Sequence, residues 1–495
     1  MIEKVEIITN PSARYEAEGT AGVLNIVLKE ERRKGWNGTF DLGGGWPARH
    51  NATINLNHRR DKFNFFGSAG IRYRNTPRLS FEDREVWEGV RGDSTTEILR
   101  QEYLGYRGGI SGNLRLGAEY QFGKYASLTG SFFYRKSDDF NTGNIDYLAY
   151  DYRETLLGVN IRDTEEAEDD ESLDYNLNFE RKFARKGQKF SANMVFTSGG
   201  ETEAMDAVEQ ALDAQRQPKG LPDLQQQIRN SEWQWELTLM ADYVHPFHKE
   251  GKFEAGYRSG IRNIDTEYRV EELDPELNIW ETLPNLTNEF AYDEQIHAIY
   301  TSIGDKFDKF SYQVGLRGEY TRIQTLLRTT NEVNDRTFAN LFPSAFLSYE
   351  FSAGNAIQLS YSRRTRRPRF WDLNPFFTFS NPISQRTGNP NLNPEFTHSI
   401  ETSYLKYWDK ATLSTSIYYR HTEGEITRIT RVDSLGIGIS RPENVATRDD
   451  IGAEFCLNVS PIKDWDITWS GNVFRGQING ANIGFARQTT FFSFT

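Results

Sequence analysis

Apolar and polar residues alternate along the chain from about residue 36 to its last residue. In one clear run, the even positions are apolar and most odd positions are polar; the two sets are Phe310, Tyr312, Val314 and Leu316, and Ser311, Gln313, Arg317 and Glu319. This period is typical of a β-strand that has one face in an apolar medium and the other in a polar medium. It also predicts strands near residues 113–120, 189–196, 412–419 and 466–473.

The connections between these strands alternate between short turns and long polar stretches. Short turns are predicted near residues 60, 123, 186, 250, 307, 354, 409 and 463, and long ones over 74–104, 138–171, 201–231, 269–290, 325–337, 365–395 and 422–446. A membrane β-barrel has this order, because tight periplasmic turns lie at one rim and long extracellular loops at the other. The count is about 18 strands, each long enough for the roughly 9–11 residues that cross a bilayer.

Composition narrows the class of protein further. Aromatic residues make up 14% of the chain, which fits the aromatic girdles of such barrels. No stretch approaches the roughly 18 apolar residues of a spanning helix, so a helical membrane protein is excluded. The net charge of -12 argues against a nucleic-acid partner, and the single Cys456 excludes a disulfide framework within the chain.

Residues 5–29 form a second pattern: a β-run, a turn segment that contains Asn10, Pro11, Gly19 and Gly22, and another β-run. The pattern resembles the last part of the plug domain of a TonB-dependent outer-membrane receptor. The resemblance implies an all-β fold, with residues 1–30 as the C-terminal end of a plug in the lumen and residues 31–495 as a transmembrane antiparallel β-barrel. Receptors of this kind have 22 strands. We therefore expect a fragment that lacks its signal peptide, its TonB-contacting segment and its last strands.

A third pattern lies in the predicted long connection 365–395. Its second half resembles the "GNPxLxPE" segment of these receptor barrels at Gly388, Asn389, Pro390, Leu392, Pro394 and Glu395. The preceding Arg-Pro and Phe-Trp-Asp-Leu-Asn-Pro stretch narrows the resemblance to the outer membrane protein beta-barrel subfamily. The resemblance places this segment on the extracellular side.

An arginine cluster precedes that segment. It consists of Arg363, Arg364, Arg366, Arg367 and Arg369, with Trp371 close behind. Guanidinium groups bind carboxylates and phosphates, so one interpretation is an anion-attracting patch that contacts the ligand. The other is that the arginines pair with carboxylates of the plug or lumen and that Trp371 packs at the rim.

Two predicted loops differ from the rest in composition. Residues 163–171 form an acidic run, which predicts a solvated loop or, as the alternative, a cation-attracting rim. Residues 204–227 are rich in Gln and Ala, which allows a short helix in that loop.

Catalytic and metal motifs are not found. The seven histidines include one close pair, His245 and His248, and no HExxH, CxxC, EF-hand or GxSxG pattern occurs. The sequence therefore predicts no enzyme, no metal and no cofactor. The resemblance implies a TonB-dependent receptor in the Gram-negative outer membrane that imports a scarce or large nutrient, with TonB and an unidentified ligand as partners and a surface lipoprotein as a further one. A passive porin or a barrel-type adhesin is the alternative.

Overall fold

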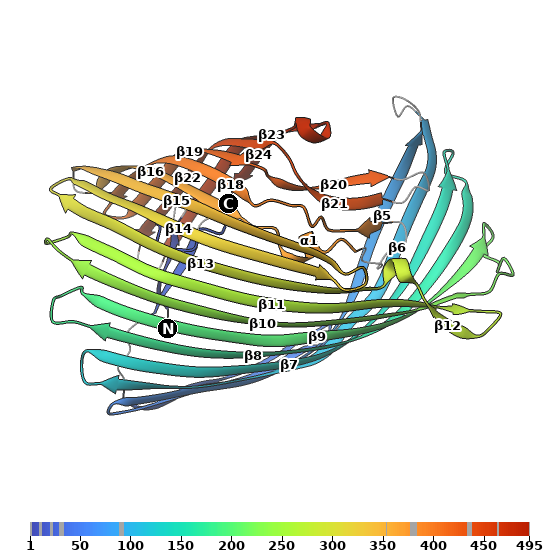
Figure 1. The fold of residues 1–495 in the computed structure, drawn as a ribbon, viewed down its shortest axis with the longest axis horizontal. Helices are drawn as coiled ribbons and strands as arrows, with labels where there is room; N and C mark the ends of the chain where they lie inside the picture. Colours follow the sequence, from blue (N-terminus) through green and yellow to red (C-terminus); the bar gives the residue numbers. More distant parts are fainter. Residues whose placement is uncertain are drawn as a thin grey trace.

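The computed structural model describes residues 2–8, 12–19, 23–28, 34–88, 94–352, 354–376, 384–432, 438–462 and 465–494. Within them, 18 long antiparallel strands and the short β12 form one closed barrel (Figure 1). The long strands are β3 (Gly35–Gly45), β4 (Arg49–Arg60), β5 (Phe63–Glu88), β6 (Ser94–Phe122), β7 (Ala126–Asp151), β8 (Leu156–Lys182), β9 (Lys189–Asp213), β10 (Leu224–Pro246), β11 (Lys252–Asp274), β13 (Asn288–Phe307), β14 (Phe310–Leu327), β15 (Glu332–Ser352), β16 (Asn355–Arg366), β18 (Glu395–Trp408), β19 (Ala411–Glu423), β22 (Thr447–Ile462), β23 (Trp465–Gly480) and β24 (Phe485–Phe494). The predicted all-β antiparallel barrel and its number of about 18 strands are confirmed, and the plug in the lumen stays a prediction.

Smaller elements lie at the end of the barrel that carries the long connections. They are β12 (Ile279–Thr282), the 3-10 helices η1 (Pro284–Leu286) and η2 (Ala481–Ile483), the helix α1 (Phe370–Leu373), and a separate sheet of β17 (Ser384–Arg386), β21 (Gly438–Asn444) and β20 (Ile426–Val432). Among the described residues, no helix is long and apolar enough to cross a membrane.

Seven of the eight predicted short turns lie between consecutive long strands, at the left end of the barrel in Figure 1, and the one near residue 463 lies outside the described residues. The predicted long connections are partly wrong. Residues 74–104, 138–171 and 201–231 lie mostly within strands, because β5 to β11 run for 23 to 29 residues. Residues 325–337 also lie mostly within strands, because β14 ends at Leu327 and β15 begins at Glu332. The acidic run 163–171 therefore belongs to β8, and no helix forms in residues 204–227, which contain the end of β9, a turn and the start of β10.

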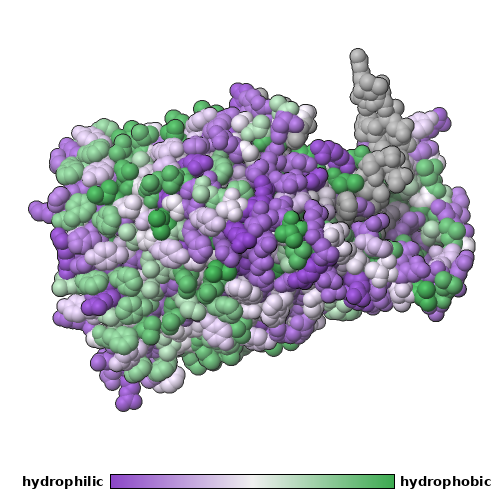
Figure 2. Space-filling view, viewed as in Figure 1, coloured by the Kyte–Doolittle hydropathy of each residue, from purple (hydrophilic) through white to green (hydrophobic). Residues whose placement is uncertain are grey.

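The two faces of the strands have the predicted environments. On β14, Val314 and Leu316 are 48% and 44% exposed on the outside, whereas Arg317 and Glu319 are buried on the inside. Figure 2 shows hydrophobic residues gathered over the end with the short turns and hydrophilic residues toward the other end. The outer surface at the short-turn end thus suits lipid, and the longer strands carry polar residues beyond it.

The N-terminal residues form an antiparallel pair, β1 (Ile2–Ile8) and β2 (Val23–Leu28), as the predicted β-runs require. Between them, residues 12–19 lie against the inner wall. Ala13 is buried there, and a Cβ added to Gly315 of β14 would lie 2.8 Å from the Ala13 Cβ. Only a glycine at position 315 lets the segment approach the wall this closely. The division into a plug end and a barrel at residue 30 stays a prediction.

Candidate functional site

The connection after β16 folds back into the barrel instead of extending away from it. Its helix α1 begins after Arg369, whose backbone N–H donates to the Asp372 carboxylate at 3.4 Å. Arg428 of β20 donates to the same carboxylate at 2.8 Å. Leu373 and Leu392 are buried against the inner wall together with Ile264, Phe290, Tyr292, Ile323, Leu327 and Ile426. A small apolar core therefore fixes this connection across the inside of β11 to β14.

The GNPxLxPE residues make this fold-back possible. The N–H groups of Gly388 and Asn389 donate to the carbonyls of Asn374 and Asp372, at 2.8 and 2.6 Å. A Cβ at position 388 would lie 2.3 Å from the Asn374 carbonyl oxygen, so the backbones can pair only if this residue is glycine.

The other residues of this motif bind neighbouring elements. The Asn389 side chain donates to the Pro442 carbonyl at 3.1 Å and accepts from Arg441 at 3.0 Å. Asn334 donates to the Pro390 carbonyl, Pro394 is buried, and Glu395 accepts from the Ile426 N–H at 2.9 Å. The motif thus has a structural role in positioning the connection.

The segment of residues 12–19 is joined to the top of β16. The Gly19 N–H donates to the Thr365 carbonyl at 3.1 Å, and the Thr365 N–H donates to the Ala17 carbonyl at 3.0 Å. Gly19 has a φ of 95°, which a glycine adopts at little cost. The Arg364 guanidinium donates to the carbonyls of Glu16, Glu18 and Gly19. One arginine thus satisfies three carbonyl groups of a chain segment that has no regular sheet around it.

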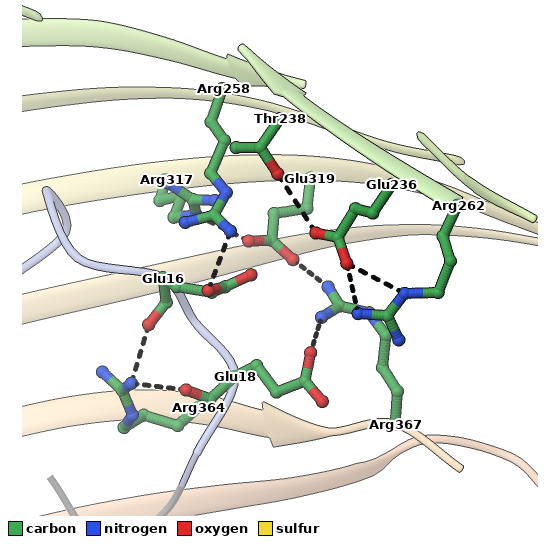
Figure 3. A network of polar contacts seen from close by, with 10 residues as sticks. All are labelled: Glu16, Glu18, Glu236, Thr238, Arg258, Arg262, Arg317, Glu319, Arg364 and Arg367. Carbon is green, nitrogen blue, oxygen red and sulfur yellow. Dashed lines mark hydrogen bonds and ion pairs between the residues drawn. The ribbon is translucent and has the colours of Figure 1, made fainter. Parts of the chain in front are cut away.

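A set of ion pairs surrounds this junction, and we call it the inner-wall ion network (Figure 3). Its members are Glu16, Glu18, Arg258, Arg317, Glu319, Arg364 and Arg367. Arg367 donates to Glu18 at 2.9 Å and to Glu319, and Arg317 donates to Glu319 at 2.6 Å. Arg258 pairs with Glu16 at 3.2 Å. The side chains of Arg317, Glu319 and Arg367 are almost completely buried, so each depends on its partner for the charge it carries.

The remaining members of the predicted arginine cluster lie apart from one another. Arg363 points to the other face of β16, donates to the Leu341 carbonyl at 2.7 Å and lies over the Phe396 ring. Arg366 pairs with Glu395 at 3.6 Å, and the exposed Arg369 lies over the Trp371 ring. Trp371 is 50% exposed. The contacts of Arg364, Arg366 and Arg367 favour the pairing alternative, and a ligand contact of this cluster stays a prediction.

Three predicted motif residues, Asn10, Pro11 and Gly22, lie outside the described residues. Of the two predicted neighbouring histidines, His248 pairs with Asp305 at 2.7 Å and His245 interacts with Tyr243 at 3.1 Å. The described residues contain no group of three or more His, Cys, Asp or Glu side chains that could hold a metal ion.

Above the ion network, the inner wall and the folded-back connection enclose a cavity of about 510 Å³. Glu203, Glu232 and Asn288 line it from β9, β10 and β13, and Phe370, Trp371 and Phe376 line it from the connection. Arg386 and Arg428 also line it. We call this space the upper cavity.

The sequence did not predict Glu203, Glu232 or Asn288 as site residues. Glu203 and Asn288 fall in the predicted long connections 201–231 and 269–290, and Glu232 is a polar residue without a motif. Their inward position follows from the alternation along β9, β10 and β13, once those strands are known to extend this far.

Comparison with known proteins identifies the family to which this barrel belongs. Residues 181–495 match the sequence model of the outer membrane protein beta-barrel family. The chain belongs to this family. Its location in the Gram-negative outer membrane follows from the family. No curated protein sequence matches the chain significantly.

Solved structures with a similar fold are outer-membrane receptors and transporters. The pyoverdine receptor FpvA from Pseudomonas aeruginosa PAO1 aligns with a TM-score of 0.61 and 11% identity, over 100% of this chain and 69% of its own. The copper transporter OprC aligns with 0.60 and 13%, over 96% and 67%. The alcaligin receptor FauA from Bordetella pertussis aligns with 0.56 and 12%, over 99% and 70%. At these identities the likeness establishes the fold, and the predicted resemblance to a receptor barrel is confirmed at that level.

Proposed function

We propose that this outer membrane protein beta-barrel is a TonB-dependent receptor that imports a scarce or large nutrient. In this proposal residues 1–30 are the terminal part of the plug. The ligand binds on the extracellular side, and TonB pulls on the plug from the periplasm to open a path. No covalent chemistry takes place.

The junction between residues 12–19 and β16 carries this proposal. A gated transporter needs a chain segment inside the barrel that is held firmly at rest but can be released without unfolding the wall. Polar contacts fit this need better than apolar packing, because water can replace hydrogen bonds and ion pairs when the segment moves. Arg364 and Arg367 supply such contacts, and the wall strands keep their own backbone pairing without them.

The alcaligin and pyoverdine receptors and the copper transporter among the solved structures with this fold support import of a nutrient. The comparisons do not support a surface lipoprotein as a partner. A passive porin or a barrel adhesin is the second candidate. A porin would constrict its interior with a loop and would not begin with a segment such as residues 5–29.

Liposome swelling with the full-length protein tests the proposal. A receptor closed by its plug admits no small sugar in the absence of TonB, so liposomes in an arabinose solution should not swell. Swelling at the rate of a general porin would overturn the proposal.

A further inference from the structure

We propose that the upper cavity binds a cationic group, an ammonium or a guanidinium, on the imported ligand. The inference rests on the proposed function and names the chemical class of the ligand. On the barrel side of the cavity, the Asn288 side-chain oxygen and the Glu232 carboxylate have no hydrogen-bond donor among the described residues, and aromatic rings line the opposite side.

Asn288 supplies the first acceptor. It is 1% exposed, and its amide group donates to the Asn374 side-chain oxygen at 3.1 Å. That oxygen also accepts from the Phe376 backbone N–H at 3.2 Å, so the atom on Asn374 must be the oxygen. The Asn288 atom in contact with it is therefore the nitrogen, and the Asn288 Oδ1 is the atom left over. This buried oxygen has no hydrogen-bond partner among the described residues, and an acceptor of this kind is costly unless a donor reaches it.

Two carboxylates line the cavity farther along the same wall, where Tyr268 and Asn230 separate Glu203 from Asn288 in the strand register. Glu203 lies opposite Asn230, and Glu232 lies opposite Glu201, in the pairing of β9 with β10. The Glu232 carboxylate has no ion pair or hydrogen bond within the part of the chain that the structure describes. Burial and the nearby Glu166 raise the pKa of Glu203, although the Asn230 side chain and Arg107 lower it. A bound cation would compensate the charge of Glu232, which no described side chain pairs.

Negative charge extends from these residues along the inner wall. Asp139, Glu168 and Glu203 face one another directly across β7, β8 and β9. Asp170, Glu201 and Glu232 form the next row across β8, β9 and β10. Like charges directly opposite each other destabilise a sheet, so folding alone does not account for these rows. Asp139 and Asp170 have arginines within 3.5 and 3.8 Å, which leaves the charge greatest near the cavity. We call these six residues the acidic rows.

The opposite side of the cavity suits a cation as well. Phe370, Trp371 and Phe376 line it, and the faces of aromatic rings attract ammonium and guanidinium groups. The Arg369 guanidinium already lies 5.2 Å from the Trp371 ring centre, which shows that this ring accepts a cation. Of the two lining arginines, Arg428 is paired with Asp372 at 2.8 Å. Arg386 is exposed on the connection side, so it directs the cationic group of a ligand toward β9 and β10.

Calorimetric titration of the purified full chain in detergent tests the proposal. The probes are three blocked dipeptides, acetyl-Arg-Arg-amide, acetyl-Gln-Gln-amide and acetyl-Glu-Glu-amide. We expect the arginine probe to bind at least about tenfold more tightly than the other two. Glu203→Gln and Glu232→Gln should each weaken its binding about tenfold or more, since each removes a charged hydrogen-bond acceptor.

Glu289→Gln is the matched control. Glu289 is an exposed residue next to Asn288 on the outer face of β13, and its substitution changes the net charge by the same amount. Binding of the arginine probe should not change in this variant. Equal weakening by Glu289→Gln and Glu203→Gln, or equal binding of the arginine and glutamate probes, would overturn the inference. Neither result affects liposome swelling, so the proposed function is tested separately.

Discussion

The inner-wall ion network and the acidic rows lie on the same inner surface but differ in how their charges are balanced. In the network, the buried Arg317, Glu319 and Arg367 contact one another in a chain of opposite charges. In the acidic rows, carboxylates face carboxylates across neighbouring strands. The network therefore contributes to the structure at rest, whereas the acidic rows cost stability until a cation binds. The arginine cluster is easier to recognise in the sequence than the acidic rows. Most of its arginines, however, already bind carboxylates or carbonyl groups of this chain.

The largest effect should come from breaking the network. Arg367→Met leaves Glu18 without its partner and removes one of the two cations beside the buried Glu319. We expect the free energy of unfolding, measured by guanidinium titration in detergent, to fall by about 3–5 kcal/mol. Arg363→Met is the control, because Arg363 lies on β16 shortly before Arg367 and, among the described residues, forms only a carbonyl hydrogen bond and ring contacts; it should cost about 1–2 kcal/mol. Equal losses in the two variants would show that the buried ion pairs of Arg367 stabilise the fold no more than the contacts of Arg363 do.

A charge on the outer face should cost nearly as much. Val314→Lys or Leu316→Lys places an ammonium in lipid near the midplane, and we expect a loss of about 2–4 kcal/mol in lipid vesicles. Phe190 and Leu413 are predicted to behave in the same way. Gln313→Lys points to the polar interior and should cost about 1 kcal/mol or less. The reverse order would mean that the two faces have been assigned wrongly.

The fold-back that closes the upper cavity should be sensitive to Gly388. Gly388→Ala forces a Cβ against the Asn374 carbonyl oxygen, and we expect a loss of about 1–3 kcal/mol together with faster protease cleavage of the connection 367–394. Gly260→Ala is the control, because a Cβ there has no neighbour within 4 Å. If both variants are cleaved at the wild-type rate, the connection does not depend on this close approach.

The smallest effect, of opposite sign, belongs to the acidic rows. Glu203→Gln removes repulsion from Glu168 and should raise the free energy of unfolding by about 0.2–1 kcal/mol at pH 7. Because folding raises the pKa of Glu203, the folded state binds its proton more readily than the unfolded state. The repulsion is lost as the pH falls through that raised pKa, so the gain should disappear toward pH 4. A loss of stability in this variant at pH 7 would contradict the contrast between the two regions.

The sequence predicted the barrel because lipid and the lumen impose opposite demands on alternate residues, as on Val314 and Arg317. It did not predict where the strands end. Beyond the membrane both faces of β8 meet water, so residues 163–171 lack the apolar positions that reveal a strand, and their acidic composition predicts a loop. The strand pairing continues there because neighbouring hairpins satisfy its backbone groups.

The site was harder to predict than the fold. The arginine cluster was found, but its partners Glu18 and Glu319 are 349 and 48 residues away from Arg367 in the sequence. Only the closed barrel brings them together. Asn288 illustrates the other difficulty, because an unpaired oxygen becomes visible only when all its neighbours are known.

Hydrogen–deuterium exchange at the Gly19 and Thr365 amides tests most directly whether the ion network holds residues 12–19 to the wall. Both amides are hydrogen-bonded across the junction, so they should exchange slowly in the wild-type chain and in Glu203→Gln. Arg364→Met removes the donor to three carbonyls of the segment and should accelerate both at least about tenfold. Exchange in the wild type at the rate of unprotected amides, or no change in Arg364→Met, would contradict the account.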